Sequence, residues 1–358
     1  MIRVAINGYG RIGRVAHRVI LEKHSSEIEV VGINAGSSTD IAGWAHLLKY
    51  DTVYGPINPE LRIKNYELRE EEKTGTLKDC IGYLVINDKK IPVFSQRDPA
   101  LLPWKDLNVD VVIESTGKFR KEEELKAHLT AGAKAVVLSA PAKDQIPTYV
   151  LSVNAKDYKG ENIISNASCT TNCVAPVAKI MLDNFGIEKA MMTTIHGYTS
   201  DQRLDDGGHK DLRRARAAGQ NIIPTSTGAT TAASKTIPEL EGIFNGLAIR
   251  VPVIVGSLSD FTFLLKRETT KEEINEVFKK EAESPVYKGI LEVTEDLIVS
   301  SDIIGNPASS IVDLSLTQVV GGNLAKVIAW YDNEYGYANR LVEEVVMVGN
   351  RLRLENGN

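Results

Sequence analysis

The residues best suited to chemistry are a cysteine and a histidine in the middle of the chain. Cys169 lies in the run Ser-Asn-Ala-Ser-Cys-Thr-Thr-Asn-Cys, residues 165–173, and His196 follows in Thr-Ile-His-Gly-Tyr-Thr. The helix-like run 172–185 would place Cys169 near a helix N-terminus, where exposed N–H groups and the macrodipole favour an anion. We therefore expect a lowered thiol pKa and a nearby imidazole that stabilises the thiolate and moves protons.

A buried structural cysteine is the competing interpretation, and it is the commoner role for a lone cysteine. Three hydroxyl neighbours argue against it here, because they are poor core residues and good anion ligands: Ser168, Thr170 and Thr171.

Composition narrows the class of protein. The chain has 358 residues, with 43% hydrophobic and 25% charged residues, which is typical of a globular protein of two domains. A net charge of −5 argues against nucleic-acid binding, and no apolar run approaches membrane length.

Cys80, Cys169 and Cys173 form no disulfide framework, so we expect a reducing, cytoplasmic location. A zinc site on Cys169 and Cys173 would lack two ligands, so no metal is expected.

A glycine turn near the N-terminus predicts a nucleotide site. A β-branched run at 2–6 precedes Asn7-Gly8-Tyr9-Gly10-Arg11-Ile12-Gly13, then a helical stretch 14–24 and a strand 28–33. This is the form of a dinucleotide-binding βαβ unit: Gly8 permits the turn, Gly10 lets backbone approach a pyrophosphate, and Gly13 packs helix against strand. A glycine-rich turn without a ligand is the alternative.

The remaining pattern predicts an α/β protein: a Rossmann-type doubly wound parallel sheet with a second α+β catalytic domain built on a mostly antiparallel sheet. Strands at 109–114 and 135–139 flank a helix at 121–130, and the turns after both strands should line the cofactor cleft. Farther along the chain, longer strands are expected at 190–196 and 246–265, and helices at 270–283 and 334–352. We expect a dinucleotide-binding domain at 1–168, rejoined by a C-terminal helix at 333–358, and a catalytic domain at 169–332.

Several motifs, in order along nearly the whole chain, closely resemble the phosphorylating glyceraldehyde-3-phosphate dehydrogenase family. Besides the glycine turn, they are 165–173, His196 with Tyr198 and Thr199, Asp211-Leu-Arg-Arg-Ala-Arg-Ala-Ala, Ile223-Pro-Thr-Ser-Thr-Gly, Arg250-Val-Pro and Trp330-Tyr-Asp-Asn-Glu-Tyr-Gly-Tyr.

The resemblance implies reversible oxidation of glyceraldehyde 3-phosphate to 1,3-bisphosphoglycerate with inorganic phosphate. Cys169 would form a thiohemiacetal and then a thioester, with His196 as base. Thr199 and Arg250 would hold the substrate phosphate. The inorganic phosphate would be bound by Ser168, Thr227 and Gly228. Thr170 would lie beside the nucleophile, and Arg214 is a weaker candidate for phosphate binding. The resemblance also implies a homotetramer, in which the basic loop 201–220 lies near a neighbour's cofactor site.

It further implies a set of cofactor-binding residues, with Asn333 on the nicotinamide carboxamide. The set comprises Gly8, Gly10, Arg11, Ile12, Gly13, Asn34, Ala35, Ser37, Ser38, Arg97, Thr116, Gly117, Ser139, Asn333 and Tyr337.

One departure from the family bears on which cofactor is used. NAD-specific members place an Asp directly after the Asn that ends the second strand, whereas here Asn34 is followed by Ala35-Gly36-Ser37-Ser38. Without that carboxylate, nothing repels a 2′-phosphate. We therefore expect NADP to be favoured, with NAD as the second cofactor. The alternative is that the next acid, Asp40, folds back onto the ribose.

Two other functions stay open at this point. An erythrose-4-phosphate dehydrogenase shares the fold and the Cys/His pair, although Thr199, Thr227 and Gly228 match the glyceraldehyde enzyme better. A non-enzymatic nucleotide-binding protein on the same fold is the other, and the set of Cys169 and His196 with Arg250 argues against it.

Overall fold

The computed structural model describes residues 1–355, so the last three positions of the expected C-terminal helix lie outside the described residues. The chain divides into two compact units. Among the described residues, unit 1 comprises 1–148, 158–166 and 338–355, and unit 2 comprises 149–157 and 167–337. The expected division at 168/169, between a dinucleotide-binding domain and a catalytic domain, stays a prediction.

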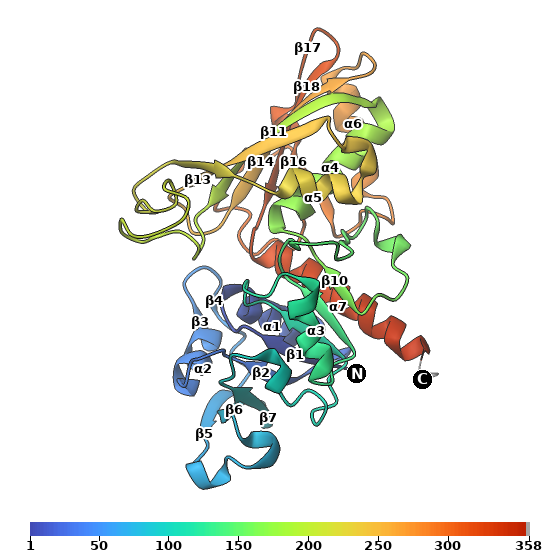
Figure 1. Ribbon diagram of the computed structural model, residues 1–358. Coiled ribbons are helices and arrows are strands. Elements are labelled where there is room, and N and C mark those ends of the chain that lie inside the picture. The colour runs from blue at the N-terminus through green and yellow to red at the C-terminus, as the bar shows by residue number, and fades with distance from the viewer. Residues whose placement is uncertain (356–358) are drawn as a thin grey trace. The chain divides into compact units, whose positions relative to one another are not determined.

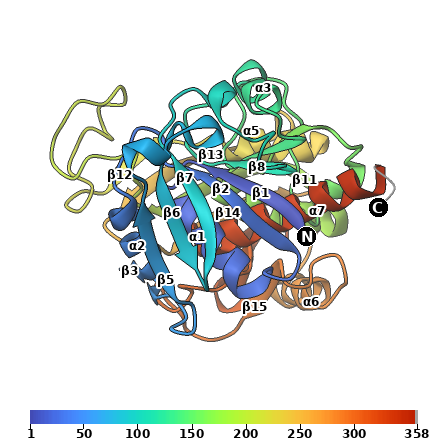
Figure 2. The ribbon, with the colours of Figure 1, turned by 90° about the horizontal axis from the view of Figure 1, so that it is seen from below.

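Unit 1 is built on an eight-stranded sheet in the order β10-β9-β8-β1-β2-β7-β6-β5 (Figures 1 and 2). The strands from β10 to β7 are parallel, and β6 and β5 continue the sheet antiparallel. The strands are β1 Ile2–Asn7, β2 Ile28–Asn34, β5 Ile63–Glu67, β6 Cys80–Ile86, β7 Lys89–Phe94, β8 Val111–Glu114, β9 Ala135–Leu138 and β10 Ile163–Ser165. β3 Tyr50–Asp51 and β4 Gly55–Pro56 form a separate pair.

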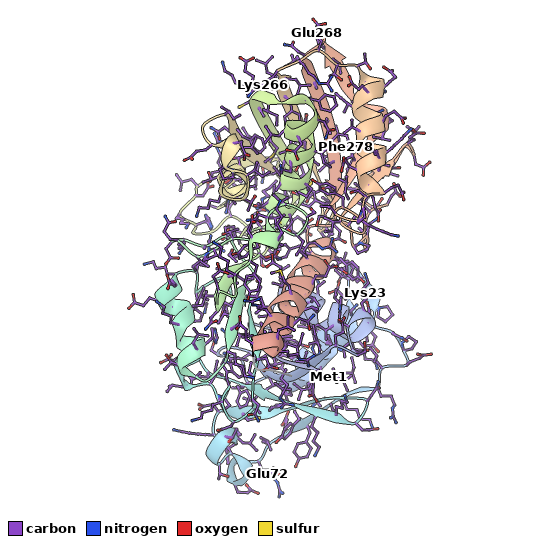
Figure 3. All side chains as sticks on the ribbon, turned by 90° about the vertical axis from the view of Figure 1, so that its right-hand side faces the viewer. Met1, Lys23, Glu72, Lys266, Glu268 and Phe278 are labelled. Carbon is purple, nitrogen blue, oxygen red and sulfur yellow. The ribbon has the colours of Figure 1, made fainter. Side chains whose placement is uncertain are left out.

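The helices of unit 1 are α1 Arg11–Lys23, α2 Ile41–Lys49, α3 Glu122–Thr130 and most of α7 Tyr335–Glu355. Lys23, at the end of α1 (Figure 3), donates a hydrogen bond to Asn339 of α7 at 2.9 Å. Strands and crossover helices alternate as the sequence predicts, and the expected Rossmann-type parallel sheet is confirmed.

The glycine turn between β1 and α1 is held by close backbone contacts. Gly8 has φ +96°, and a Cβ there would collide with the backbone of Thr116. A Cβ on Gly13 would overlap the carbonyl oxygen of Gly8, whereas one on Gly10 would meet nothing within 4 Å. Gly8 and Gly13 are therefore required for the fold itself, and Gly10 leaves space open above the turn.

Unit 2 is built on a second eight-stranded sheet in the order β12-β13-β11-β14-β18-β16-β15, with β17 paired to β18. Only β11·β13 and β15·β16 are parallel, so the expected mostly antiparallel sheet is confirmed. The elements are α4 Cys169–Phe185, β11 Ile187–Gly197, β12 Ile223–Ser226, α5 Ala229–Thr236, β13 Phe244–Val251, β14 Ser257–Leu265, α6 Lys271–Ala282, β15 Leu291–Thr294, β16 Ser310–Asp313, β17 Gln318–Val320 and β18 Leu324–Tyr331.

The helices of unit 2 bury apolar side chains against its sheet. Phe278 of α6 (Figure 3) is fully buried in a core that also contains Phe261 and Phe263 of β14 and Met181 of α4. α4 therefore begins at a solvent-accessible cysteine and continues into the core, which fixes the direction of its N-terminus.

One strand prediction was wrong in detail. The run 246–265 forms two strands, β13 and β14, which flank β11 on opposite sides. Pro252 lacks the N–H that a central strand needs, and Gly256 has φ +100°. The chain therefore leaves the sheet between these two residues.

The glycine turn yields a matched stability test. Gly13→Ala should lower the free energy of unfolding by about 2–4 kcal/mol, because its Cβ overlaps a fixed carbonyl group. Gly10→Ala should change it by less than about 1 kcal/mol. Urea unfolding followed by tryptophan fluorescence measures both, and equal midpoints for the two variants would contradict this account of the turn.

Candidate active site

Cys169 is the first residue of α4, as the sequence predicts. Ser168 is the N-cap: its Oγ accepts a hydrogen bond from the Thr171 N–H at 3.1 Å. The preceding residue, Ala167, has a left-handed φ of +53°, and its carbonyl accepts a hydrogen bond from the Tyr337 hydroxyl at 3.1 Å. The sharp turn presents Cys169, which is partly accessible to solvent, at the start of the helix.

His196 lies next to this thiol. It is the penultimate residue of β11, and its Nε2 is 3.4 Å from the Sγ of Cys169. Its Nδ1 is 2.7 Å from the carbonyl oxygen of Gly197. A proton on Nδ1 satisfies that oxygen and leaves the Nε2 lone pair facing the sulfur, which is the geometry a general base requires.

Arg250 completes the cluster from the neighbouring strand. β13 runs parallel to β11 with Arg250 paired to His196, and Nη1 of Arg250 lies 2.9 Å from His196 Nδ1 and 3.1 Å from the Gly197 oxygen. Nδ1 can form one hydrogen bond. The Gly197 carbonyl is the closer of its two neighbours and can only accept, so Nδ1 carries a proton and donates to this oxygen. Arg250 Nη1 then donates to the same oxygen. Arg250 Nε is buried with no hydrogen-bond partner among the described residues, as expected of a group that awaits an anion.

Tyr331 supports both sides of the pair. Its ring meets the His196 ring edge-on at 5.9 Å between centroids. Its hydroxyl lies 3.0 Å from Oγ1 of Thr170 and 2.8 Å from Oγ1 of Thr194. The tyrosine thus links α4 to β11 at the level of the catalytic side chains.

The protonation states follow from burial. Desolvation, reinforced by the Arg250 cation, lowers the pKa of His196 to about 3, so the imidazole is neutral at physiological pH. The expected fall in the pKa of Cys169 was wrong: desolvation raises it, and the opposing effects of Arg250 and of hydrogen bonds from Thr170 do not overcome burial. The pair therefore rests as neutral thiol and neutral imidazole.

The second cysteine of the motif is enclosed. Cys173 is fully buried, and burial raises its pKa to about 12. Its Sγ lies 3.9 Å from the Ser259 hydroxyl. Such a thiol is a core residue with negligible thiolate at neutral pH.

The expected phosphate ligands differ in the hydrogen bonds that they already make within the protein. Arg214 donates from Nε to Thr225 at 3.0 Å, from Nη1 to Asp201 at 2.6 Å and from Nη2 to the Ser226 carbonyl at 3.2 Å, so its main role is to hold the loop 201–220 against β12. Gly228 caps α5 without a side chain, and Thr227 Oγ1 accepts from the Ala229 N–H. Thr199 is half-buried, with its N–H toward Gln202.

In unit 1 the start of α1 has the features of an anion site. Its N-cap is Gly10, which has no side chain to cap the helix and has open space above it. The Arg11 guanidinium is held aside by Asp51 at 2.6 Å, while Ile12 and Gly13 continue the first turn. Helix N–H groups beneath an open glycine are what a pyrophosphate needs.

The turns after the neighbouring strands reach the same edge of this sheet. Asn34 ends β2, and the Ala35 N–H donates to Phe94 at 2.8 Å. Thr116 and Gly117 follow β8, and Ser139 follows β9, with its N–H bonded to the Glu114 carbonyl at 2.9 Å. Arg97 is exposed on the loop after β7.

Asp40 does not fold back toward this edge. Its carboxylate caps α2, accepting from the Gly43 N–H at 2.7 Å. Ser38 Oγ accepts from the Trp44 indole at 3.0 Å, and Ser37 is exposed. The loop 35–38 therefore presents small residues and hydroxyl groups.

Comparison with known proteins agrees with this geometry. Residues 2–122 match the family described as glyceraldehyde 3-phosphate dehydrogenase, NAD binding domain, and 168–333 match its C-terminal domain. The glyceraldehyde-3-phosphate dehydrogenase of Streptomyces coelicolor is 52% identical over 353 residues, covering 98% of this chain and 99% of that protein. That of Mycolicibacterium smegmatis is 49% identical, with coverage of 98% and 99%, and glyceraldehyde-3-phosphate dehydrogenase 1 of Bacillus cereus 48%, with 96% and 97%.

The chain belongs to the glyceraldehyde-3-phosphate dehydrogenase family. Among the described residues, no group of three or more His, Cys, Asp or Glu side chains could hold a metal ion. Over residues 1–355, no helix combines the length and the apolar character needed to cross a membrane.

Within this family member, Asn333 has a fixed orientation. Its Oδ1 accepts from the Gly256 N–H at 3.2 Å and from Ser257 Oγ at 2.9 Å, so its amide nitrogen points the other way. Ser257 Oγ also accepts from the Gly197 N–H at 3.2 Å. Asn333 is thereby tied to the end of the strand that carries His196.

Three residues of this cluster were not predicted from the sequence: Tyr331, Thr194 and Ser257. Tyr331 lies inside the Trp330–Tyr337 motif, which could have suggested it. Thr194 lies two positions before His196, where strand alternation places both side chains on one face. Nothing in the sequence around Ser257 singles it out.

The two cysteines differ in reactivity in a way that alkylation can measure. Iodoacetamide should label Cys169 and spare Cys173, because only the first is accessible and beside a base. Cys169→Ser should then abolish aldehyde oxidation, and Cys173→Ser should retain most of it. Peptide mass spectrometry after limited alkylation locates the label, and faster modification of Cys173 would show that the nucleophile is misassigned.

Proposed function

We propose that this chain catalyses the reversible oxidative phosphorylation of glyceraldehyde 3-phosphate to 1,3-bisphosphoglycerate with a nicotinamide dinucleotide. The chain is an oxidoreductase of the family identified above, and the relatives do not favour an erythrose-4-phosphate dehydrogenase or a non-enzymatic nucleotide-binding protein. The observation that carries the proposal is the 3.4 Å contact between Cys169 and His196, with Arg250 at the same imidazole.

The first step uses the neutral pair. Cys169 Sγ attacks the aldehyde carbon as its proton moves to His196 Nε2, which gives a thiohemiacetal. Because His196 is buried and its pKa is low, it holds that proton weakly and returns it readily to the new oxygen. Burial, which raises the pKa of Cys169, favours the protonated thiol in the free site.

The second half uses the same residues. When bound, the nicotinamide supplies the acceptor for the hydride that leaves the thiohemiacetal carbon. His196 takes the hydroxyl proton as the carbonyl re-forms, which leaves a thioester on Cys169. An oxygen of inorganic phosphate then attacks the thioester carbon, and the C–S bond breaks to release the acyl phosphate. The Cys169 thiolate takes back the proton that His196 holds, which restores the neutral pair.

Two anion sites serve this sequence. The Arg250 guanidinium, with its buried Nε, supports binding of the substrate phosphate together with Thr199. Ser168, Thr227 and Gly228 would hold the inorganic phosphate, the last through a backbone N–H at the start of α5. Thr170 is hydrogen-bonded to Tyr331 and would act by fixing the start of α4 beside Cys169. Arg214 would act by ordering the loop 201–220.

The residues present fit a nicotinamide dinucleotide. The open space at Gly10 and the uncapped start of α1 suit a pyrophosphate on Arg11, Ile12 and Gly13. Gly8, Asn34, Ala35, Arg97, Thr116, Gly117 and Ser139 would hold the remainder of the nucleotide. Asn333, whose amide nitrogen is directed by Gly256 and Ser257, would bind the carboxamide, with Tyr337 beside it.

NADP is the favoured cofactor, with NAD the second. The loop 35–38 carries no carboxylate, and Asp40 is engaged at the N-cap of α2 instead of facing the ribose. Ser37 and Ser38 supply hydroxyl groups to a 2′-phosphate, and Arg97 is the nearest expected source of charge.

A homotetramer and a cytoplasmic location complete the proposal. On the loop 201–220, Leu204 is 85% and Leu212 is 81% exposed, and a subunit contact would cover such side chains. The three free cysteines fit a reducing compartment. Steady-state assays with glyceraldehyde 3-phosphate and erythrose 4-phosphate, each with and without inorganic phosphate, test the activity. Phosphate-dependent turnover of the first aldehyde is expected, and a preference for the second would overturn the assignment.

His196→Asn should slow the formation of reduced cofactor by roughly 10²–10⁴-fold. Asparagine cannot take up the thiol and hydroxyl protons, while cofactor affinity should survive. Single-turnover absorbance at high enzyme concentration measures this step. His24→Asn is the matched control, because that histidine pairs with Glu27 in unit 1, in a different unit from His196. A near-normal rate in His196→Asn would remove the imidazole from the mechanism.

Ala35→Asp should shift cofactor selectivity from NADP toward NAD by at least about tenfold, because it restores a carboxylate against the 2′-phosphate. Asp40→Asn is the control: it keeps an N-cap and should leave the ratio unchanged. The ratio of kcat/KM for the two cofactors is the measurement. A strong preference for NAD in the unaltered chain, lost in Asp40→Asn, would show that Asp40 faces the ribose after all.

A further inference from the structure

A continuous chain of buried polar side chains runs through the sheet of unit 1. Its five members are 0–3% exposed, come from separate parts of the sequence and are joined by hydrogen bonds: Trp104, His128, Glu114, Asn7 and Asn34. We refer to these five residues as the buried polar chain. Burial of so many polar groups is costly unless every one is paired.

The direction of the hydrogen bonds is fixed from one end. The indole Nε1 of Trp104 can only donate, and it lies 3.0 Å from His128 Nδ1. Nδ1 is therefore the acceptor and Nε2 carries the proton, so His128 is neutral. Its Nε2–H donates to Glu114 Oε2 at 3.0 Å.

Glu114 is the centre of the chain. Besides His128, its Oε2 accepts from Asn7 Nδ2 at 2.5 Å. Its Oε1 accepts from the Thr116 N–H at 2.8 Å and from the Thr116 hydroxyl. The carboxylate therefore accepts hydrogen bonds from four donors, which fixes its position.

The Glu114 carboxylate also determines how the Asn7 and Asn34 amides are oriented at the other end of the buried polar chain. Because Glu114 only accepts, Asn7 must turn its amide nitrogen toward it and its Oδ1 toward Asn34, whose Nδ2 donates at 2.7 Å. Asn34 Oδ1 accepts in turn from the Gln96 N–H at 3.1 Å and the Gly36 N–H at 3.4 Å. The loop after β2 is thus anchored to Trp104 through four side chains: His128, Glu114, Asn7 and Asn34.

We propose that Glu114 and His128 are positioning residues for the nicotinamide dinucleotide. This inference rests on the proposed function, because the two groups that the carboxylate orders, Thr116 and the loop 34–38, are expected cofactor contacts. Both lie at the carboxyl ends of parallel strands, β8 and β2, where such sheets bind ligands.

A purely stabilising role explains the arrangement less well. Apolar residues of similar volume would fill this interior at least as favourably as a buried carboxylate and imidazole. What the polar chain adds is direction: each amide and ring has one allowed orientation. The chain holds backbone N–H groups of two cofactor turns, that of Thr116 through Glu114 and that of Gly36 through Asn34. Fixed orientation lowers the cost of ordering those turns when ligand binds.

Calorimetric titration of the full-length chain with NAD or NADP alone, without aldehyde, tests the proposal. Glu114→Gln places an amide nitrogen against donors and should raise the Kd for the dinucleotide by about tenfold or more. His128→Leu should act similarly, whereas His128→Gln keeps a donor for Glu114 and should retain most of the affinity. Leu125→Ala, on the same helix and fully buried, is the control for lost packing and should change Kd less than about twofold.

The iodoacetamide reactivity of Cys169 should stay unchanged in all these variants, because the thiol lies in unit 2. If Glu114→Gln or His128→Leu does not fold, Trp104→Phe removes only the indole donor and should still raise Kd about threefold. Unchanged Kd in the variants, with normal binding by the unaltered chain, would overturn the positioning role and leave the proposed function intact. Absence of binding by the unaltered chain would overturn both.

Discussion

The contact between Cys169 and His196 is the constraint on which unit 2 depends. A thiol and an imidazole 3.4 Å apart require α4 to begin where β11 ends. Ser168 fixes that start by capping the helix, and the left-handed Ala167 turns the chain into it. The parallel pairing of β11 with β13 then places Arg250 against the same imidazole, so one local geometry delivers nucleophile, base and anion ligand together.

Burial sets how this pair works. Desolvation raises the pKa of the thiol and lowers that of the imidazole, so the resting pair is uncharged. Charge then develops only as the thiol attacks, in an environment where Arg250 and the start of α4 are already oriented. Tyr331 keeps the two elements in register without losing its proton, since burial raises its own pKa.

Much of this could be predicted from sequence because it is local. The glycine turn, the Ser168 cap and the alternation of strands and helices are each encoded within a few residues. The lowered pKa expected for Cys169 was wrong because a helix start is visible in sequence, but the depth at which it is buried is not. Tyr331, Ser257 and the buried polar chain depend on residues distant in sequence, and β13 separates from β14 because Pro252 and Gly256 interrupt the run.

The most direct test of the account is to observe the covalent intermediate. The chain is mixed with glyceraldehyde 3-phosphate and excess oxidised NADP in phosphate-free buffer, quenched in acid and measured by intact-protein and peptide mass spectrometry. We expect an acyl group on Cys169, formed together with reduced cofactor and discharged when inorganic phosphate is added. Reduced cofactor formed without any modification of Cys169, or an acyl group on another residue, would contradict it.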